Sequence, residues 1–179
     1  MIYVPRVVNE KEKNIVESYL SIKYGISLAT EKSYYNSAGT LIWDVEKNAA
    51  FNNRVTGIGR DDRMSLNQKQ SGNSEKDGLY IGFTKIETSN QKNATVIKDK
   101  DFLIWGDNNK NSTIIQKKNE TSMHKMPRVW KINTIADDAN AMDVFTTQLL
   151  INKSEMAISK ELKENKEKNK NTVYSDLET

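Results

Sequence analysis

Four consecutive apolar residues, Phe102-Leu103-Ile104-Trp105, place the strongest constraint on how this chain folds. A strand with one face in solvent alternates apolar and polar residues, because successive side chains point to opposite faces. This run is apolar at every position and therefore on both faces. It predicts a central strand that is buried on both sides and forms the heart of the core.

The chain after residue 26 has a strand-like pattern. Short apolar runs lie between clusters of Asn, Gly, Ser and Asp, which are typical of turns. These runs predict strands at residues 40–44, 54–60, 65–70, 79–83, 95–97, 102–106, 128–133 and 143–151. Because no convincing helix separates them, we expect a mainly β fold, an antiparallel β-sandwich-like domain and not a doubly wound parallel sheet.

One helix precedes the predicted strands. Asn9 and Glu12 have the spacing of a capping box, and Gly25 stands where a left-handed C-terminal cap is needed. They predict an amphipathic helix from about residue 10 to residue 24, whose apolar stripe must lie on an apolar surface. The stripe consists of Ile15, Val16, Tyr19 and Leu20, with the aliphatic stem of Lys23 at its edge.

The composition changes after residue 151. Basic and acidic residues alternate from Lys153 to Lys170, and Lys160, Glu164 and Lys168 have the spacing of i,i+4 ion pairs. Such pairs contribute about 0.2–0.5 kcal/mol each, which is too little to hold a helix alone. We therefore expect residues 152–179 to form a charged tail, partly helical or disordered, with little role in the core.

Composition excludes several kinds of chemistry. The 179 residues include no cysteine and a single histidine, His124, so disulfides, thiolate sites and zinc sites with several imidazoles are excluded. With 27 basic and 24 acidic residues, the net charge of +3 gives no strong field for nucleic acid. No apolar run is long enough for a membrane span, and none follows Met1 as a signal peptide requires.

Catalytic motifs are equally scarce. A hydrolase triad would have to use His124, which we expect in a loop, and no G-x-S-x-G nucleophile motif is present. Asp and Glu are too common here for a pair of them to indicate a glycosidase. We predict no catalytic residue, and we expect that the protein is not an enzyme.

Residues 57–62, Gly-Ile-Gly-Arg-Asp-Asp, begin like a dinucleotide-binding fingerprint. Asp62 occupies the third glycine position, however, and would put a carboxylate where pyrophosphate must approach. We expect a structural turn instead, in which Gly59 permits close approach of a neighbouring strand or ring. Arg60 would then pair with Asp61, Asp62 or Asp107.

The alternative interpretation makes these residues a ligand site. Its candidates are Arg60, Asp61, Asp62, Asp107, Asn108, Tyr34 and Tyr35, the two tyrosines being an expected exposed pair in a polar loop. Oxygen atoms of Asp61, Asp107 and Asn109 could also bind Ca²⁺, a hard cation, although the EF-hand loop pattern is absent. We predict no cofactor, with Ca²⁺ as the one alternative.

The three tryptophans could stack on sugar rings if they lined an exposed groove. Trp43, Trp105 and Trp130 each lie beside aliphatic residues, and aromatic residues make up only 8% of the chain. A chain with so few large side chains needs them for its core. We therefore expect all three to be buried.

Several segments together resemble an arrangement found in bacterial surface proteins. Residues 2–6, followed by Tyr19-Leu20-Ser21-Ile22-Lys23-Tyr24-Gly25, are similar to the end of laminin-G/concanavalin-like modules, where a final strand leads into a helix with the motif YLxxKYG. The residues that follow resemble the domain of unknown function that comes after this motif in secreted proteins of Bacteroidota. The matching segments are residues 41–44, 48–53, 57–62, 66–71, 102–108 and 128–131.

The resemblance implies three parts: the end of a laminin-G-like module at residues 1–26, a β-rich domain of unknown function at 27–151 and the charged tail at 152–179. It implies an extracellular or cell-surface accessory module and carries no catalytic assignment. The bulk of the laminin-G sandwich is missing upstream, so the helix lacks its usual partner. It would either cover the β-domain itself or pair with another chain.

Two functional hypotheses follow. The first is a non-catalytic accessory module of a larger bacterial protein, serving adhesion, spacing or glycan contact. The second is a module that assists a glycan-degrading enzyme. The expected partners are neighbouring domains of the same polypeptide and surface glycans or proteins, with no nucleic acid and no membrane span.

Overall fold

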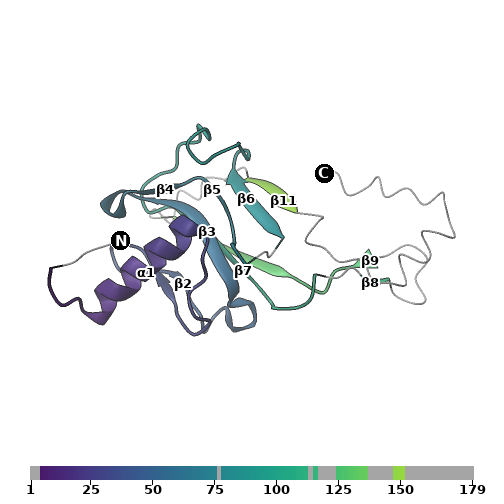
Figure 1. Ribbon diagram of the computed structural model, residues 1–179, viewed down its shortest axis with the longest axis horizontal. Coiled ribbons are helices and arrows are strands. Elements are labelled where there is room, and N and C mark those ends of the chain that lie inside the picture. Colours follow the sequence, from purple (N-terminus) through teal and green to yellow (C-terminus); the bar gives the residue numbers. More distant parts are fainter. Residues whose placement is uncertain (1–4, 76–77, 113–114, 117–123, 137–146, 152–179) are drawn as a thin grey trace.

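The computed structural model describes residues 5–75, 78–112, 115–116, 124–136 and 147–151. The described part is mainly β, and all of its strand pairs are antiparallel, as the sequence predicts. One α-helix, α1 (Glu10–Tyr24), precedes the strands (Figure 1). The predicted tail at residues 152–179 and the strand end expected at residues 2–4 lie outside the described residues.

The strands form a central sheet, a second sheet and two short ribbons. The central sheet has the order β10 (Trp130–Ile135), β7 (Phe102–Asp107), β3 (Asn53–Asp61) and β4 (Leu66–Gln68). The second sheet has the order β11 (Thr147–Ile151), β6 (Leu79–Phe83) and β5 (Gln70–Gly72). The ribbons pair β1 (Tyr34–Tyr35) with β2 (Leu41–Trp43), and β8 (Ile115–Gln116) with β9 (His124–Lys125). Short 3-10 turns, η1 (Ala49–Phe51) and η2 (Asp62–Met64), flank β3.

All six residues of β7 are buried, which confirms the predicted central strand. Its alternate side chains enter two separate cores. Phe102 and Ile104 pack with residues of α1, β1 and β2, whereas Leu103 and Trp105 pack with residues of β6. The central sheet is therefore covered on both faces, and Figure 1 shows α1 and β6 on opposite sides of β3.

Two glycines of β3 lie opposite large side chains of β7. Gly57 pairs with Ile104 and Gly59 pairs with Phe102. A Cβ atom added to Gly59 would collide with the Phe102 ring and would lie 2.6 Å from the carbonyl oxygen of Asp101. The close approach expected at Gly59 is confirmed, and the glycines of residues 57–62 belong to strand packing.

The capping box of α1 is present. The Glu12 N–H donates to Asn9 Oδ1 at 2.9 Å, the Asn9 N–H donates to the Glu12 carboxylate at 3.1 Å, and Gly25 has φ +64°. The face of α1 that lies deepest contains Ser18, Ser21 and Ile22, whereas the predicted stripe is only half-buried. Small serines let β1 come close, since the Tyr35 N–H donates to Ser18 Oγ at 3.0 Å.

The helix covers the β-domain itself, the first of the two alternatives. Ile22 is 1% exposed and packs in one core with side chains of β1, β2, β3 and β7. The described part of the chain has no helix suited to crossing a bilayer, because α1 is only 15 residues long and carries several charges.

Three local predictions were wrong. Residues 65–70 form two short strands in different sheets, and the Phe83 N–H donates to the carbonyl oxygen of Lys69 between them. His124 lies in β9 and not in a loop. Residues 95–97 form no strand, because their groups are tied to other segments: Thr95 Oγ1 donates to the carbonyl oxygen of Phe83, and Arg60 donates to that of Ile97.

Ile97 nevertheless belongs to the core and provides a test of the fold. Its side chain is 2% exposed and packs with β6 and β7, whereas the neighbouring Val96 is 85% exposed. We predict that Ile97→Ala lowers the free energy of unfolding by about 2–5 kcal/mol because it leaves a cavity. Val96→Ala, the matched control, should change it by less than about 0.5 kcal/mol. Urea denaturation measures both, and equal effects would contradict the placement of this loop.

Candidate functional site

An open groove runs along the outer side of α1, with a volume of about 820 Å³. It lies between the C-terminal half of the helix and the segment that follows. The groove exists because Gly25 ends the helix and turns the chain back, and the Ile26 N–H then donates to the carbonyl oxygen of Ser21 at 3.1 Å. We call it the α1 groove; its lining consists of Glu17, Tyr19, Leu20, Ser21, Lys23, Tyr24, Ile26, Ser27, Leu28, Ala29 and Lys32.

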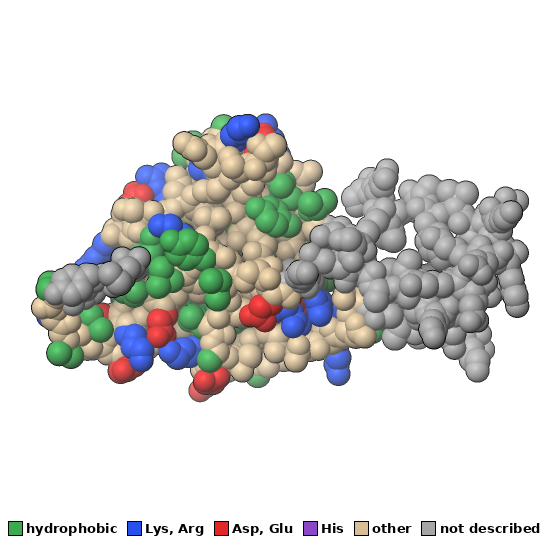
Figure 2. All heavy atoms as spheres, in the orientation of Figure 1, with side chains coloured by type: hydrophobic (Ala, Val, Ile, Leu, Met, Phe, Trp, Pro, Cys, Tyr) green, Lys and Arg blue, Asp and Glu red, His purple; other side chains and the backbone are tan. Residues whose placement is uncertain are grey.

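The α1 groove presents large apolar groups to solvent. Tyr24 is 60% exposed and Ile26 is 54% exposed. Figure 2 shows hydrophobic side chains at the surface over α1. Exposed apolar groups that gather in one hollow are typical of a surface that contacts another molecule.

The charged groups around the groove are already paired within the chain. Lys32 Nζ lies 2.6 Å from a Glu17 carboxylate oxygen, and Lys23 Nζ lies 2.6 Å from the Tyr19 hydroxyl. Lys23 Nζ also lies 5.0 Å and 5.8 Å from the ring centroids of Tyr19 and Tyr24, so the cation lies close to both aromatic rings. The hydrogen bond with Tyr19 raises the pKa of Lys23 above its usual value. The groove suits contact with an apolar or aromatic surface.

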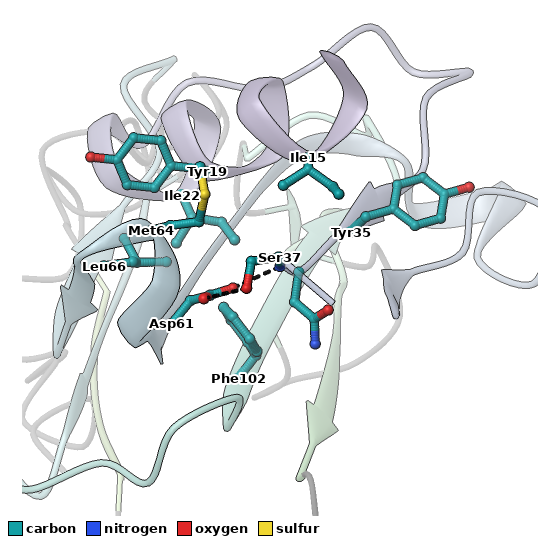
Figure 3. A pocket seen from close by; sticks show the side chains of 10 residues that line it. Ile15, Tyr19, Ile22, Tyr35, Ser37, Asp61, Met64, Leu66 and Phe102 are labelled. Atoms are coloured by element: carbon teal, nitrogen blue, oxygen red, sulfur yellow. Dashed lines mark hydrogen bonds between the residues drawn. The ribbon is translucent and has the colours of Figure 1, made fainter. Parts of the chain in front are cut away.

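A second hollow, of about 10 Å³, lies beneath α1 at the C-terminal end of β3 (Figure 3). It has room for about one water molecule, so it is too small for a substrate. Asp61 forms its polar wall: the Ser37 N–H and hydroxyl each donate to the carboxylate at 2.7 Å. The other walls are mostly apolar and include Phe102, Leu66 and Ile22. We call it the Asp61 niche.

Asp61 is 2% exposed, and its carboxylate forms an ion pair with Lys100. Lys100 Nζ lies 2.5 Å from Asp61 and 3.2 Å from Asp99. Burial works to raise the pKa of Asp61, but the hydrogen bonds from Lys100 and Ser37 outweigh it and hold that pKa below its usual value. Burial likewise works to lower the pKa of Lys100, and its two carboxylate partners raise it. The carboxylate that lines the niche therefore belongs to a buried ion pair whose cation lies outside the niche.

The predicted site residues fall at opposite ends of β3. Arg60, Asp61 and Asp62 lie at its C-terminal end, whereas Asp107 pairs with Asn53 at the other end. β3 has nine residues, and the eight steps from Asn53 to Asp61 span about 26 Å at about 3.3 Å per residue. One cation cannot contact both ends, so Asp61 and Asp107 share no Ca²⁺ site. Among the residues that the structure describes, no group of three or more acidic or histidine side chains could hold a metal ion.

An ion pair holds each end of β3 in place. Arg60 forms an ion pair with Asp62, one of its three expected partners. Its Nε lies 2.6 Å and its Nη2 lies 2.9 Å from the two carboxylate oxygens of Asp62. At the other end, Asp107 is fully buried and binds Arg54 at 2.6 Å and 2.5 Å. The sequence did not predict Arg54 as the partner of Asp107, because the two residues are 53 positions apart and no local pattern connects them.

The asparagines after Asp107 fix the adjacent loop. Asn108 Oδ1 accepts from the Val129 N–H at 3.1 Å, and its Nδ2 donates to the carbonyl oxygen of Pro127 at 3.1 Å. Asn109 Oδ1 accepts from Arg54 Nη2 at 3.1 Å. The polar groups at this end of β3 therefore hold β10 and β3 in place.

The aromatic residues are more buried than expected. The prediction of an exposed Tyr34-Tyr35 pair is wrong for Tyr34, which is 1% exposed and packs in the core, and Tyr35 is half-buried. The Leu28 N–H donates to the Tyr34 hydroxyl at 2.9 Å, which satisfies its polar end inside the fold. Trp43 and Trp105 are buried as predicted, and Trp130 is half-buried.

The fold and the site define a helix-covered antiparallel β-domain with an open apolar groove. The family described as Domain of unknown function (DUF8202) matches residues 12–179, and the chain belongs to this family. The match begins within α1, so it includes most of the helix as well as the sheets. Comparisons with curated proteins and with solved structures found no match.

Asp61 predicts a specific dependence of stability on pH. Because its pKa is lower in the folded state, the stabilisation is present above the unfolded-state pKa near 4 and is lost as pH falls through the folded value. Asp61→Asn should lower the free energy of unfolding at pH 7 by about 3–5 kcal/mol, since it leaves Lys100 without its buried partner. The difference between wild type and variant should shrink below about pH 4.

Asp99→Asn is the matched control. Asp99 also pairs with Lys100, but its side chain is 43% exposed. Its removal should cost less than about 1 kcal/mol. Urea denaturation of the three proteins from pH 7 to pH 3 measures the effect. If the difference in free energy of unfolding between wild type and Asp61→Asn stays constant across that range, the lowered pKa assigned to Asp61 is contradicted.

Proposed function

We propose that this domain is a non-catalytic accessory module of a larger bacterial protein, outside the cell or on its surface, and that the α1 groove contacts a neighbouring domain of the same polypeptide. The observation that carries the proposal is the groove itself. Its largest exposed groups are apolar, and the charges beside them are paired within the chain. Such a surface favours adhesion or spacing between domains over chemistry on a substrate.

The two buried candidate carboxylates, Asp61 and Asp107, support a non-catalytic role. A glycosidase needs two carboxyl groups free to face a sugar from opposite sides. Here Asp61 and Asp107 are buried in ion pairs with Lys100 and Arg54, and they lie at opposite ends of β3. Their oxygens hold the fold together and do not face the α1 groove.

The resemblance to laminin-G/concanavalin-like modules agrees with this role. The helical motif Tyr19-Leu20-Ser21-Ile22-Lys23-Tyr24-Gly25 supplies much of the groove lining. In the proposed arrangement a module of that kind, in a secreted or surface protein of Bacteroidota, precedes this domain and lies against the groove. If the neighbour were a glycan-degrading domain instead, the same contact would make this module an assistant to that enzyme.

Calorimetry of the parent polypeptide tests the contact. We predict that the domain unfolds in a single transition with its neighbour, because the exposed faces of Tyr24 and Ile26 are buried between them. The double variant Tyr24→Ser/Ile26→Ser should separate this into two transitions. Val96→Ser, which alters an even more exposed apolar residue outside the groove, should leave one transition. Separate transitions in the unaltered polypeptide would contradict the proposal.

Two further assays separate the remaining roles. Binding on a glycan array, with and without Ca²⁺, distinguishes glycan contact from contact with a protein domain. Incubation of the chain with polysaccharides should release no sugar. Hydrolytic activity that co-purifies with the chain would contradict the non-catalytic assignment.

A further inference from the structure

Three buried polar atoms stand out in the part of the chain that the structure describes. Thr56 Oγ1, Trp105 Nε1 and Trp130 Nε1 are the only buried side-chain nitrogen or oxygen atoms there without a hydrogen-bond partner. Thr56 and Trp105 are each 0% exposed, and the Trp130 nitrogen is buried although its ring is partly accessible. A buried polar group without a partner costs about 1–3 kcal/mol, so such groups seldom occur together.

The three residues are neighbours on one face of the central sheet. Thr56 lies directly opposite Trp105 across β3 and β7, and Trp105 lies opposite Ile132 of β10. Trp130 is two residues before Ile132, so it projects to the same face and is the diagonal neighbour of Trp105. Directly opposite side chains have Cβ atoms about 4.5–5.5 Å apart, and diagonal ones about 7–8 Å apart.

The described side chains around these three polar atoms provide no hydrogen-bond partner. This face packs against the second sheet through Ile58, Leu79, Ile81, Phe83 and Leu103, which are all apolar. On the opposite face of the central sheet, the buried indole N–H of Trp43 has a side-chain acceptor. Trp43 is 1% exposed, and its Nε1 donates to Asn52 Oδ1 at 3.0 Å. The Trp43 indole therefore has an acceptor within the chain, whereas the Trp105 and Trp130 indoles have none among the described residues.

The chemistry of the three atoms defines that acceptor. An indole N–H can only donate, whereas a threonine hydroxyl can donate or accept. A hydroxyl-type oxygen can accept from both indoles and donate to Thr56, which makes three hydrogen bonds, the usual number for a buried water. Such an oxygen belongs to water or to a small alcohol.

We propose that Thr56, Trp105 and Trp130 form an internal site for one hydroxyl-type oxygen, held between the two sheets. The bound oxygen ties β3, β7 and β10 together on the face that the second sheet covers. The half-buried Trp130 lies at the outer limit of the site and gives it access to solvent. This inference is independent of the function proposed for the α1 groove.

The test uses the three indole N–H signals in the NMR spectrum of the full chain labelled with ¹⁵N. We expect cross-relaxation between a long-lived bound hydroxyl proton and the indole protons of Trp105 and Trp130, and none at Trp43, whose partner is Asn52. Thr56→Val keeps the shape and removes the hydroxyl. It should shift the Trp105 and Trp130 signals, leave Trp43 in place and raise the equilibrium constant for unfolding roughly fivefold.

Thr56→Ser provides the second variant, because it keeps the hydroxyl and should keep the cross-relaxation at both indoles. Mass spectrometry of material released on unfolding identifies the source of the oxygen: a small alcohol if one is found, water if none is. Either result is consistent with the site. If Thr56→Val is neutral or stabilising and leaves the Trp105 and Trp130 signals unchanged, the three atoms are simply unpaired and the proposal is overturned.

Discussion

The pairing of β3 with β7 depends on two positions that have no side chain. Gly57 and Gly59 leave space that Ile104 and Phe102 of the opposing strand occupy. This lets β7 bury large side chains on the face toward α1, while Leu103 and Trp105 fill the other face. Since both faces are filled, the helix and the second sheet each obtain a preformed apolar surface on which to pack.

Ion pairs fix the two ends of this unit. Arg54 holds Asp107 at one end and Lys100 holds Asp61 at the other, and both carboxylates are almost fully buried. A buried charge without a partner is strongly destabilising, so these groups are committed to the fold. The same residues are the ones that look most like a ligand or metal site in the sequence. Neither carboxylate lines the α1 groove, which is the surface to which we assign the proposed contact.

Local and strongly patterned features could be predicted from the sequence. The capping box at Asn9 depends on residues three apart, and the buried strand β7 depends on one apolar run, so both were correct. Long-range features could not be predicted. The partners of Asp61 and Asp107 are 39 and 53 positions away, and Tyr34 enters the core from a segment that is polar in sequence. The α1 groove was missed because it forms only where the chain turns back after Gly25.

The dependence of the whole domain on the β3–β7 pair is measured most directly by native-state hydrogen exchange. We predict that the amides of Leu103 and Ile104 exchange only through global unfolding, with the free energy obtained from urea denaturation, and that Ile22 in α1 and Ile81 in β6 lose protection no later than they do. Exchange of the β7 amides through a lower-energy opening, while Ile22 or Ile81 stays protected, would contradict the account.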